Sequence, residues 1–134
     1  MYFNSINRNI FKGEKEMTFP KKVKMSGFEI NLVLIEHEIS YEVAEQQGSF
    51  VSKPPLTIYL DKKIIDKGDR ASLNLLIHEF LHFVYYQYQL SVTKQLDDDT
   101  REELEVNSMA NGIIELLLDT ELKQWILKVM KECK

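Results

Sequence analysis

The stretch from Leu73 to Val84 constrains the fold more than any other, because its apolar residues recur with the period of an α-helix. They follow the spacing i, i+3, i+4, i+7, i+8 and i+11: Leu73, Leu76, Ile77, Phe80, Leu81 and Val84. Such a pattern predicts a helix that is buried along one side. His78 and His82 lie off the middle of this stripe and four residues apart, so a helix would carry both imidazoles on one face. We expect Glu79 to point away from the stripe as well.

The letters His78-Glu79-Phe80-Leu81-His82 have the spacing H-E-x-x-H, which predicts a metal site. Two imidazoles on one helical face can bind one zinc ion. Glu79 is rotated by one residue step from His78, so it can reach a water on the ion without binding the ion itself. The chain has only three histidines, and their chance placement in this pattern has a probability of about one per cent. We therefore expect His78 and His82 as zinc ligands and Glu79 as a general base.

A third zinc ligand is also expected, because a catalytic zinc keeps about three protein ligands and one open position. No histidine follows His82, so this ligand should be a carboxylate from the next helix, which begins with three glutamates. We favour Glu103, because Asn107 lies four residues further along the same face and could hydrogen-bond a ligating histidine. Glu102 and Glu105 remain alternatives.

Two further helices are predicted after the metal helix. The first, from about residue 101, has an expected buried stripe of Val106, Met109, Ala110, Ile113 and Leu117. Asp99 with Glu102, and Thr100 with Glu103, both have capping-box spacing at its start. The last helix is expected to be capped by Thr120 and to bury Leu122, Trp125, Ile126, Val129 and Met130.

The segment before the metal helix has the alternating pattern of β-strands. Residues 23–25 and 28–34 flank the turn pair Ser26-Gly27, which predicts a hairpin. Residues 48–52 and 56–60 are predicted as two more strands. Asp66 or Asp69 is expected to cap the metal helix, which should extend to about residue 90. His37 follows the second strand and belongs to no ligand spacing, so we expect an ordinary surface histidine.

Composition narrows the range of functions. The chain has 134 residues, a net charge of −4 and 44% hydrophobic residues, which suits one domain with a modest core. Lys and Arg number 17 against 21 Asp and Glu, which argues against a nucleic-acid partner. Cys133 is the only cysteine, so we expect neither a disulfide framework nor a cysteine-based zinc site, and we expect a reducing compartment.

The sequence also shows no recognisable membrane-spanning segment or signal peptide. No run approaches the roughly 18 apolar residues of a membrane span, and the N-terminus lacks the apolar core of a signal peptide. We therefore expect a cytoplasmic protein with no membrane partner. Residues 1–16 are polar and weakly patterned, which predicts a flexible leader before a single domain over residues 17–134.

The two helices that carry these letters resemble the gluzincin metallopeptidases. His78-Glu79-x-x-His82, followed about twenty residues later by glutamates and by Val106-Asn107-x-Met109-Ala110, is similar to compact ImmA/IrrE-like and phage-encoded members. The resemblance implies an α+β fold, with a small, mainly antiparallel sheet packed on a zincin-like HExxH helix, then a glutamate-bearing helix and a C-terminal helix. It implies zinc held by His78, His82 and Glu103, with Glu79 as general base and Asn107 as a supporting residue. A neighbouring alignment of the same letters puts Glu105 in the ligand position.

The function expected from these features is a narrow-specificity zinc peptidase that acts on a peptide or protein, such as a regulatory protein. Residues 56–60 are our predicted strand for receiving the substrate backbone by β-augmentation. The alternative is a metal-binding or interaction module of phage or mobile-element origin that has lost turnover. Intact Glu79 argues against this alternative, because a structural zinc site does not need that residue.

Overall fold

The computed structural model describes residues 19–39, 47–90 and 95–133, so the predicted leader lies outside the described residues. Within these ranges the chain forms four strands and five helices. In chain order they are β1 (Lys22–Met25), β2 (Phe28–Ile35), α2 (His37–Ile39), β3 (Gly48–Val51), β4 (Thr57–Asp61), α3 (Lys62–Lys67), α4 (Arg70–Gln87), α5 (Asp98–Asp119) and α6 (Lys123–Glu132). None of the described helices is both long and apolar enough to cross a bilayer.

The four strands form one mixed sheet in the order β1-β2-β4-β3. β1 pairs with β2, and β3 with β4, in antiparallel fashion, whereas β2 and β4 are parallel. The predicted hairpin is confirmed: Ser26 and Gly27 both have positive φ angles, 53° and 83°, which suits a tight turn between twisted strands. The α+β class and the strand positions are thus as expected. The sheet has two antiparallel strand pairs and one parallel pair, β2 with β4.

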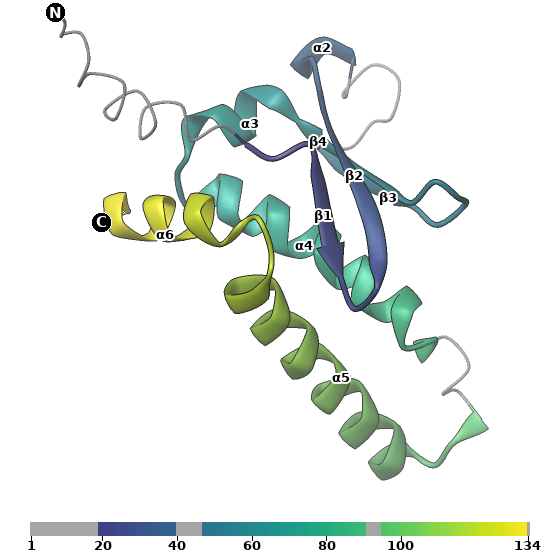
Figure 1. Ribbon diagram of the computed structural model, residues 1–134. Coiled ribbons are helices and arrows are strands. Elements are labelled where there is room, and N and C mark those ends of the chain that lie inside the picture. The colour runs from purple at the N-terminus through teal and green to yellow at the C-terminus, as the bar shows by residue number, and fades with distance from the viewer. Residues whose placement is uncertain (1–18, 40–46, 91–94, 134) are drawn as a thin grey trace, which may run out of the picture.

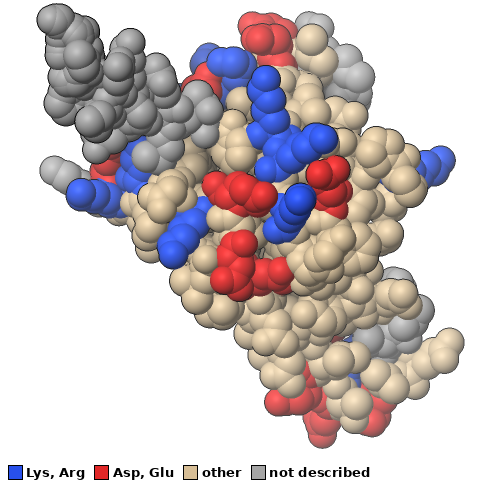
Figure 2. Space-filling model, viewed as in Figure 1, with Lys and Arg blue, Asp and Glu red and all other residues tan. Residues whose placement is uncertain are grey.

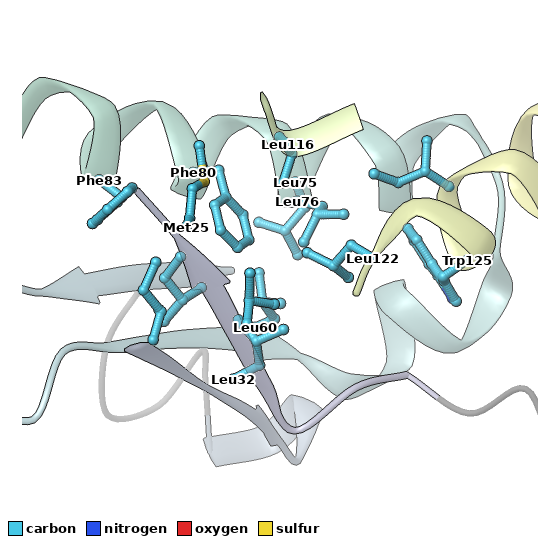
Figure 3. Close-up of a cluster of buried hydrophobic side chains, with 14 of the residues drawn as sticks. Met25, Leu32, Leu60, Leu75, Leu76, Phe80, Phe83, Leu116, Leu122 and Trp125 are labelled. Atoms are coloured by element: carbon cyan, nitrogen blue, oxygen red, sulfur yellow. The ribbon is translucent and has the colours of Figure 1, made fainter. Parts of the chain in front are cut away.

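The core lies between one face of the sheet and α4 (Figure 1). Alternate residues of the strands point toward the helix, as the period of two requires. The fully buried side chains from the two layers meet there: Val23, Met25, Ile30, Ile58 and Leu60 from the sheet, and Leu76, Phe80 and Phe83 from α4. Figure 3 shows that Leu116 from α5, Leu122 just before α6, and Trp125 from α6 extend this cluster beyond the sheet.

Two carboxylates bind the outer side of the hairpin formed by β1, the turn and β2. The backbone N–H of Ser26 donates to Glu115 Oε2 at 2.6 Å, and its hydroxyl donates to Oε1 at 2.5 Å. The N–H of Lys24 donates to Glu121 Oε1 at 3.1 Å. These bonds fasten the end of α5 and the turn after it to the hairpin. The opposite edge of the sheet is β3, which pairs only with β4 among the described strands.

The position of β4 corrects one prediction. Residues 56–60 were expected to offer an edge for a substrate, but β4 lies between β2 and β3, so both of its sides are already paired. A strand's place in a sheet depends on which distant segments pair with it, and its own sequence does not encode that place. Among the described strands, the edge on this side of the sheet is β3, which was predicted only as a short strand.

Helix α5 is rotated relative to the prediction. Val106 is 56% exposed, and the residues of this helix that are buried are Ser108, Gly112 and Leu116. α5 crosses α4 through small residues: a Cβ placed on Gly112 would lie 2.4 Å from Cγ2 of Val84. Close approach of two helix backbones requires small residues at the contact, so packing overrides the apolar pattern here.

Several helix ends also differ from the prediction. α5 is capped by Asp97, whose side chain accepts the N–H of Thr100 at 2.9 Å, so neither predicted capping box starts the helix. Helix α3 was not predicted; buried Asp61 caps it by accepting the N–H of Ile64. In α6 the predicted stripe is confirmed except for Met130, which is 55% exposed. The N-cap residue of α6 is Leu122, whose N–H donates to Thr120 Oγ1 at 3.2 Å.

Candidate metal centre

Helix α4 carries the H-E-x-x-H letters in its middle, as predicted. Asp69 caps this helix by accepting the N–H of Ser72 at 3.2 Å, which selects Asp69 over Asp66 among the expected caps. The rings of His78 and His82 lie with their centroids 5.0 Å apart and their planes at 75°. Both residues are exposed, and the side chain of His78 is 62% accessible. The structure therefore brings the two imidazoles together on one accessible face.

Glu79 is buried against the edge strand β3, with only 3% of its surface exposed. This placement differs from the expectation that it would point away from the core. Gly48 makes room for it: a Cβ at that position would lie 3.0 Å from Glu79 Oε2, 3.1 Å from Glu79 Cγ and 2.8 Å from the carbonyl oxygen of Tyr59. The glycine at the start of β3 is therefore part of the site, because any larger residue would push against the carboxylate.

The carboxylate of Glu79 is poorly satisfied. Its Oε1 is buried and has no hydrogen-bond partner among the described residues. Its Oε2 lies 4.0 Å from Nε2 of His78, which is beyond a direct hydrogen bond. Burial raises the pKa of Glu79 by disfavouring the charged form, and the nearby rings of His78 and His82 oppose this rise. A carboxyl group with a raised pKa is suited to accept a proton and return it later in a reaction.

Two hollows open on either side of this carboxylate. One has a volume of about 420 Å³ and is lined by Gln47, Gly48, Asn74 and His78, among others. The other has a volume of about 430 Å³ and extends past His82 to Phe50, Ser52, Tyr85 and Tyr86. Both are lined by His78 and Glu79, so the pair lies between two spaces that run beside β3. An extended chain could occupy both spaces at once.

The backbone of β3 alternates between its partner strand and the open edge. Asp61 donates its N–H to the carbonyl of Gln47 at 2.8 Å, which marks these two residues as a hydrogen-bonded pair. Hydrogen-bonded and non-hydrogen-bonded pairs alternate along an antiparallel ladder, so Ser49 also bonds to β4. The N–H and C=O groups of Gly48 and Phe50 consequently point away from β4. No described strand pairs with this backbone edge, which lies immediately beside Glu79.

A third metal ligand does not join the histidines in this structure. Among residues 19–39, 47–90 and 95–133, no three side chains of His, Cys, Asp or Glu are grouped so that they could hold a metal ion. Glu103 is exposed near the start of α5. It lies nine residues before Gly112, where α5 meets α4, which corresponds to about 13 Å of helix.

The rotation of α5 distinguishes the three glutamates. Glu105 is half-buried and shares the helical face of Ser108, Gly112 and Leu116, at the spacing i, i+3, i+7 and i+11. Glu102 and Glu103 are exposed, and Glu103 and Asn107 lie on the side turned away from α4. The helix therefore orients Glu105, and not the favoured Glu103, toward the body of the protein.

His37 is not part of the histidine pair. Its Nδ1 lies 2.7 Å from Oδ2 of Asp61, whose other oxygen caps α3. Asp61 is fully buried, and the side chain of His37 is 36% accessible. The histidine that was expected to be an ordinary surface residue thus helps to satisfy a buried carboxylate at the ends of the parallel strands β2 and β4.

The residues fit a metal site in part. Two accessible imidazoles converge at one place, and beside them lies a buried carboxylate oxygen whose missing partner a water on the ion could supply. Sequence reasoning identified these three residues but missed Gly48 and the edge of β3, because a glycine before a short strand is equally typical of a turn. Neither a family model, nor a curated protein, nor a solved structure matches this chain.

Proposed function

We propose that this protein is a zinc-dependent peptidase in which His78 and His82 bind the ion and Glu79 is the general base. The observation that supports this most is the buried Oε1 of Glu79, which lacks a partner beside two converging imidazoles. An unsatisfied buried polar group costs about 1–3 kcal/mol, so stability does not account for it. A proton-transfer role does account for it, because such a group must be free to accept a proton.

The position of each residue suggests its role in the proposed reaction. When bound, zinc would supply a water of near-neutral pKa and polarise the scissile carbonyl. Glu79 takes the proton of the attacking water and delivers it to the leaving amine. The close contact with Gly48 holds this carboxylate in place under β3, while burial raises its pKa toward the range in which one group can serve as both base and acid.

The substrate in this proposal is an extended polypeptide that pairs with β3. The outward N–H and C=O groups of Gly48 and Phe50 would bind its backbone, in the manner of β-augmentation. A peptide at this edge would lie over the two hollows beside His78 and Glu79. A folded protein would first have to offer an extended segment, which favours narrow specificity and a regulatory target.

We infer that the third ligand comes from the glutamates of α5. The spacing to Asn107 favours Glu103, whereas the orientation of the helix favours Glu105. Glu102 is exposed like Glu103, and neither the spacing to Asn107 nor the orientation of the helix favours it. These assignments differ in a measurable way, because removal of the true ligand weakens zinc binding and removal of the others does not.

The second candidate function is a metal-binding or interaction module without turnover. It is favoured by one observation, namely that no third ligand is grouped with the histidines among the described residues. Two histidines alone bind zinc more weakly than a complete site does, and they need no general base. The two candidates therefore predict opposite results for substitution of Glu79.

The test compares zinc content and turnover in matched variants. Glu79→Gln should retain zinc and lose at least a hundredfold in turnover of a fluorescence-quenched peptide library, because the proton acceptor is gone. His78→Ala and His82→Ala should lose zinc. The control is Glu132→Gln, which removes an exposed carboxylate from α6 and should change neither quantity. Parental turnover by Glu79→Gln would exclude the peptidase proposal, and zinc binding without any turnover in the parent would favour the second candidate.

A separate experiment identifies which glutamate of α5 binds the zinc. Glu105→Ala and Glu103→Ala should be compared for zinc affinity by competition with a chelator. The variant with the larger loss, expected to be ten- to a hundredfold or more, identifies the ligand. Equal affinities in Glu102→Ala, Glu103→Ala and Glu105→Ala would show that α5 supplies no ligand.

A further inference from the structure

Helices α5 and α6 carry an unusual share of the exposed apolar surface. Among the described residues, twelve large hydrophobic side chains are exposed, and six of them lie on these two helices. They are Leu104, Val106, Ile114 and Leu118 on α5, and Leu127 and Met130 on α6. Single exposed hydrophobic residues are ordinary, but a row of them on adjoining elements marks an interaction surface.

On α5 these residues form a ridge. Val106, Ala110, Ile114 and Leu118 follow each other at intervals of four residues, which places them along one line on the helix surface. Val106, Ile114 and Leu118 are 56%, 55% and 55% exposed. The line lies opposite the face that contacts α4, so no described part of the chain covers it. We call this line the α5 ridge.

The end of α5 beyond the ridge is strongly acidic. Five carboxylates lie in its first eight residues: Asp98, Asp99, Glu102, Glu103 and Glu105. The only cation there is Arg101, which pairs with Asp98 at 3.0 Å. Figure 2 shows red side chains gathered at this end of α5, the end farthest from the sheet in Figure 1. A partner of the α5 ridge should therefore combine apolar side chains with positive charge.

Helix α6 has the complementary character. Its buried face is formed by Trp125, Ile126 and Val129. Its opposite face carries the exposed residues Leu127 and Met130 together with Lys123 and Lys131. Glu132 is the one acidic residue of this helix. We call this surface the α6 face.

We propose that the protein forms a two-fold symmetric dimer in which the α6 face of each copy packs on the α5 ridge of the other. The lengths match: Val106 to Leu118 spans about 18 Å of helix, and the ten residues of α6 span about 15 Å. Within one chain the contact cannot form, because three residues join the two helices and both surfaces point outward. Two-fold symmetry produces the contact twice, which a self-complementary pair of surfaces requires.

The two helices in each contact should run antiparallel. This direction brings Lys131 of one copy toward the acidic start of α5 in the other, where Asp99 lies. In this arrangement the two helix dipoles also point in opposite directions, which is favourable. The apolar residues Leu127 and Met130 then lie against the α5 ridge between the charged ends. A second copy of the chain thus provides both the apolar residues and the positive charge that the α5 ridge and its acidic end require.

The experiment measures the mass of the full chain by sedimentation velocity over a wide concentration range. The parent should show a reversible monomer–dimer equilibrium, and Ile114→Asp and Met130→Asp should each abolish it. Val33→Asp is the control, because Val33 is 36% exposed on the far face of the sheet and should leave the dimer intact. Circular dichroism and thermal unfolding of each variant establish that the fold is kept.

Charge reversal tests the pairing itself. Asp99→Lys and Lys131→Glu should each raise the dissociation constant of the dimer about tenfold, and more at low salt. The combined variant should return to within about threefold of the parent, because the opposite charges meet again across the interface. A chain that is monomeric at every concentration overturns the proposal, and so does a dimer that is insensitive to Ile114→Asp and Met130→Asp. Neither result bears on the proposed peptidase activity.

Discussion

At the scale of single residues, the contact between Glu79 and Gly48 defines the candidate site. The helix alone would leave a glutamate next to His78 in solvent, where it would be an ordinary acid. β3 converts it into a buried group, and it can do so because Gly48 has no side chain to collide with Oε2 at 3.0 Å. The chemistry of Glu79 therefore depends on a residue that is distant in sequence and carries no functional group.

The burial of Glu79 predicts a pH-dependent stability in the metal-free protein. Burial raises the pKa of Glu79, so the folded chain binds its proton more tightly than the unfolded chain does. This favourable contribution is complete below the ordinary glutamate pKa of about 4.3 and is lost as pH rises through the raised value. Glu79→Gln should thus be more stable than the parent by about 1 kcal/mol at neutral pH, and this advantage should vanish in acid.

Urea unfolding in the presence of a chelator, at neutral and at acid pH, measures this difference. Glu132→Gln serves as the control, because its carboxylate is exposed and its removal should change the free energy of unfolding at neither pH. Equal stability of Glu79→Gln and the parent at neutral pH would mean that the carboxylate is well solvated in the metal-free protein.

At the scale of elements, small residues set the orientation of α5. Ser108 and Gly112 let the helix approach α4 closely, and this contact turns Glu105 inward and the α5 ridge outward. A helix packs where its backbone can come nearest, and the apolar pattern decides only among the orientations that the contact leaves open. The candidate third ligand and the proposed dimer surface are both consequences of one glycine.

Gly112→Ala tests this contact. The added methyl group would lie 2.4 Å from Cγ2 of Val84, so overpacking should cost about 1–3 kcal/mol even though alanine favours a helix by up to about 1 kcal/mol. Val84→Ala, combined with it, opens the space again, so the double variant should be more stable than the two single effects added together. Asn111→Ala is the control on the exposed side of the same helix and should be neutral or slightly stabilising. Additive losses would show that Gly112 and Val84 do not meet.

At the scale of the whole molecule, the two edges of the sheet differ, among the described residues, in whether side chains bind their outward backbone groups. Glu121 accepts a backbone N–H of β1 and Glu115 accepts that of the turn residue Ser26, whereas Gly48 and Phe50 of β3 have backbone groups turned away from β4. Covering an edge prevents uncontrolled strand pairing, and the edge of β3 is where we propose that a substrate binds. The start of β3 lies against the middle of α4, because Gly48 makes room there for Glu79.

Zinc binding should stabilise the entire domain. A ligand that binds only the folded state adds about 2.7 kcal/mol when its free concentration is a hundred times its dissociation constant. Thermal unfolding should therefore shift upward with zinc and return with a chelator in the parent and in Glu79→Gln. His78→Ala should lose the shift, and calcium should produce none, because its preferred ligands are oxygens. A shift of equal size in His78→Ala would place the zinc elsewhere.

The sequence determined those features that rest on local periodicity. The helix around His78 and His82, the hairpin at Ser26 and Gly27, and the buried stripe of α6 were all predictable, because neighbouring residues alone specify them. The same is true of the pairing of His78 and His82, but not of the buried position of Glu79, which depends on Gly48. The spacing of four residues on a single helix brings the two imidazoles together whatever the rest of the chain does.

The tertiary structure decided everything that depends on segments far apart in the chain. Pairing made β3 the edge strand in place of β4, and thereby buried Glu79; packing through Gly112 turned α5 and exposed Val106. No local pattern encodes these outcomes, because strand order and helix rotation are set by the closest fit between surfaces that meet only after folding. The proposed third ligand is undetermined by sequence for the same reason, because which glutamate of α5 faces α4 depends on how the two helices pack.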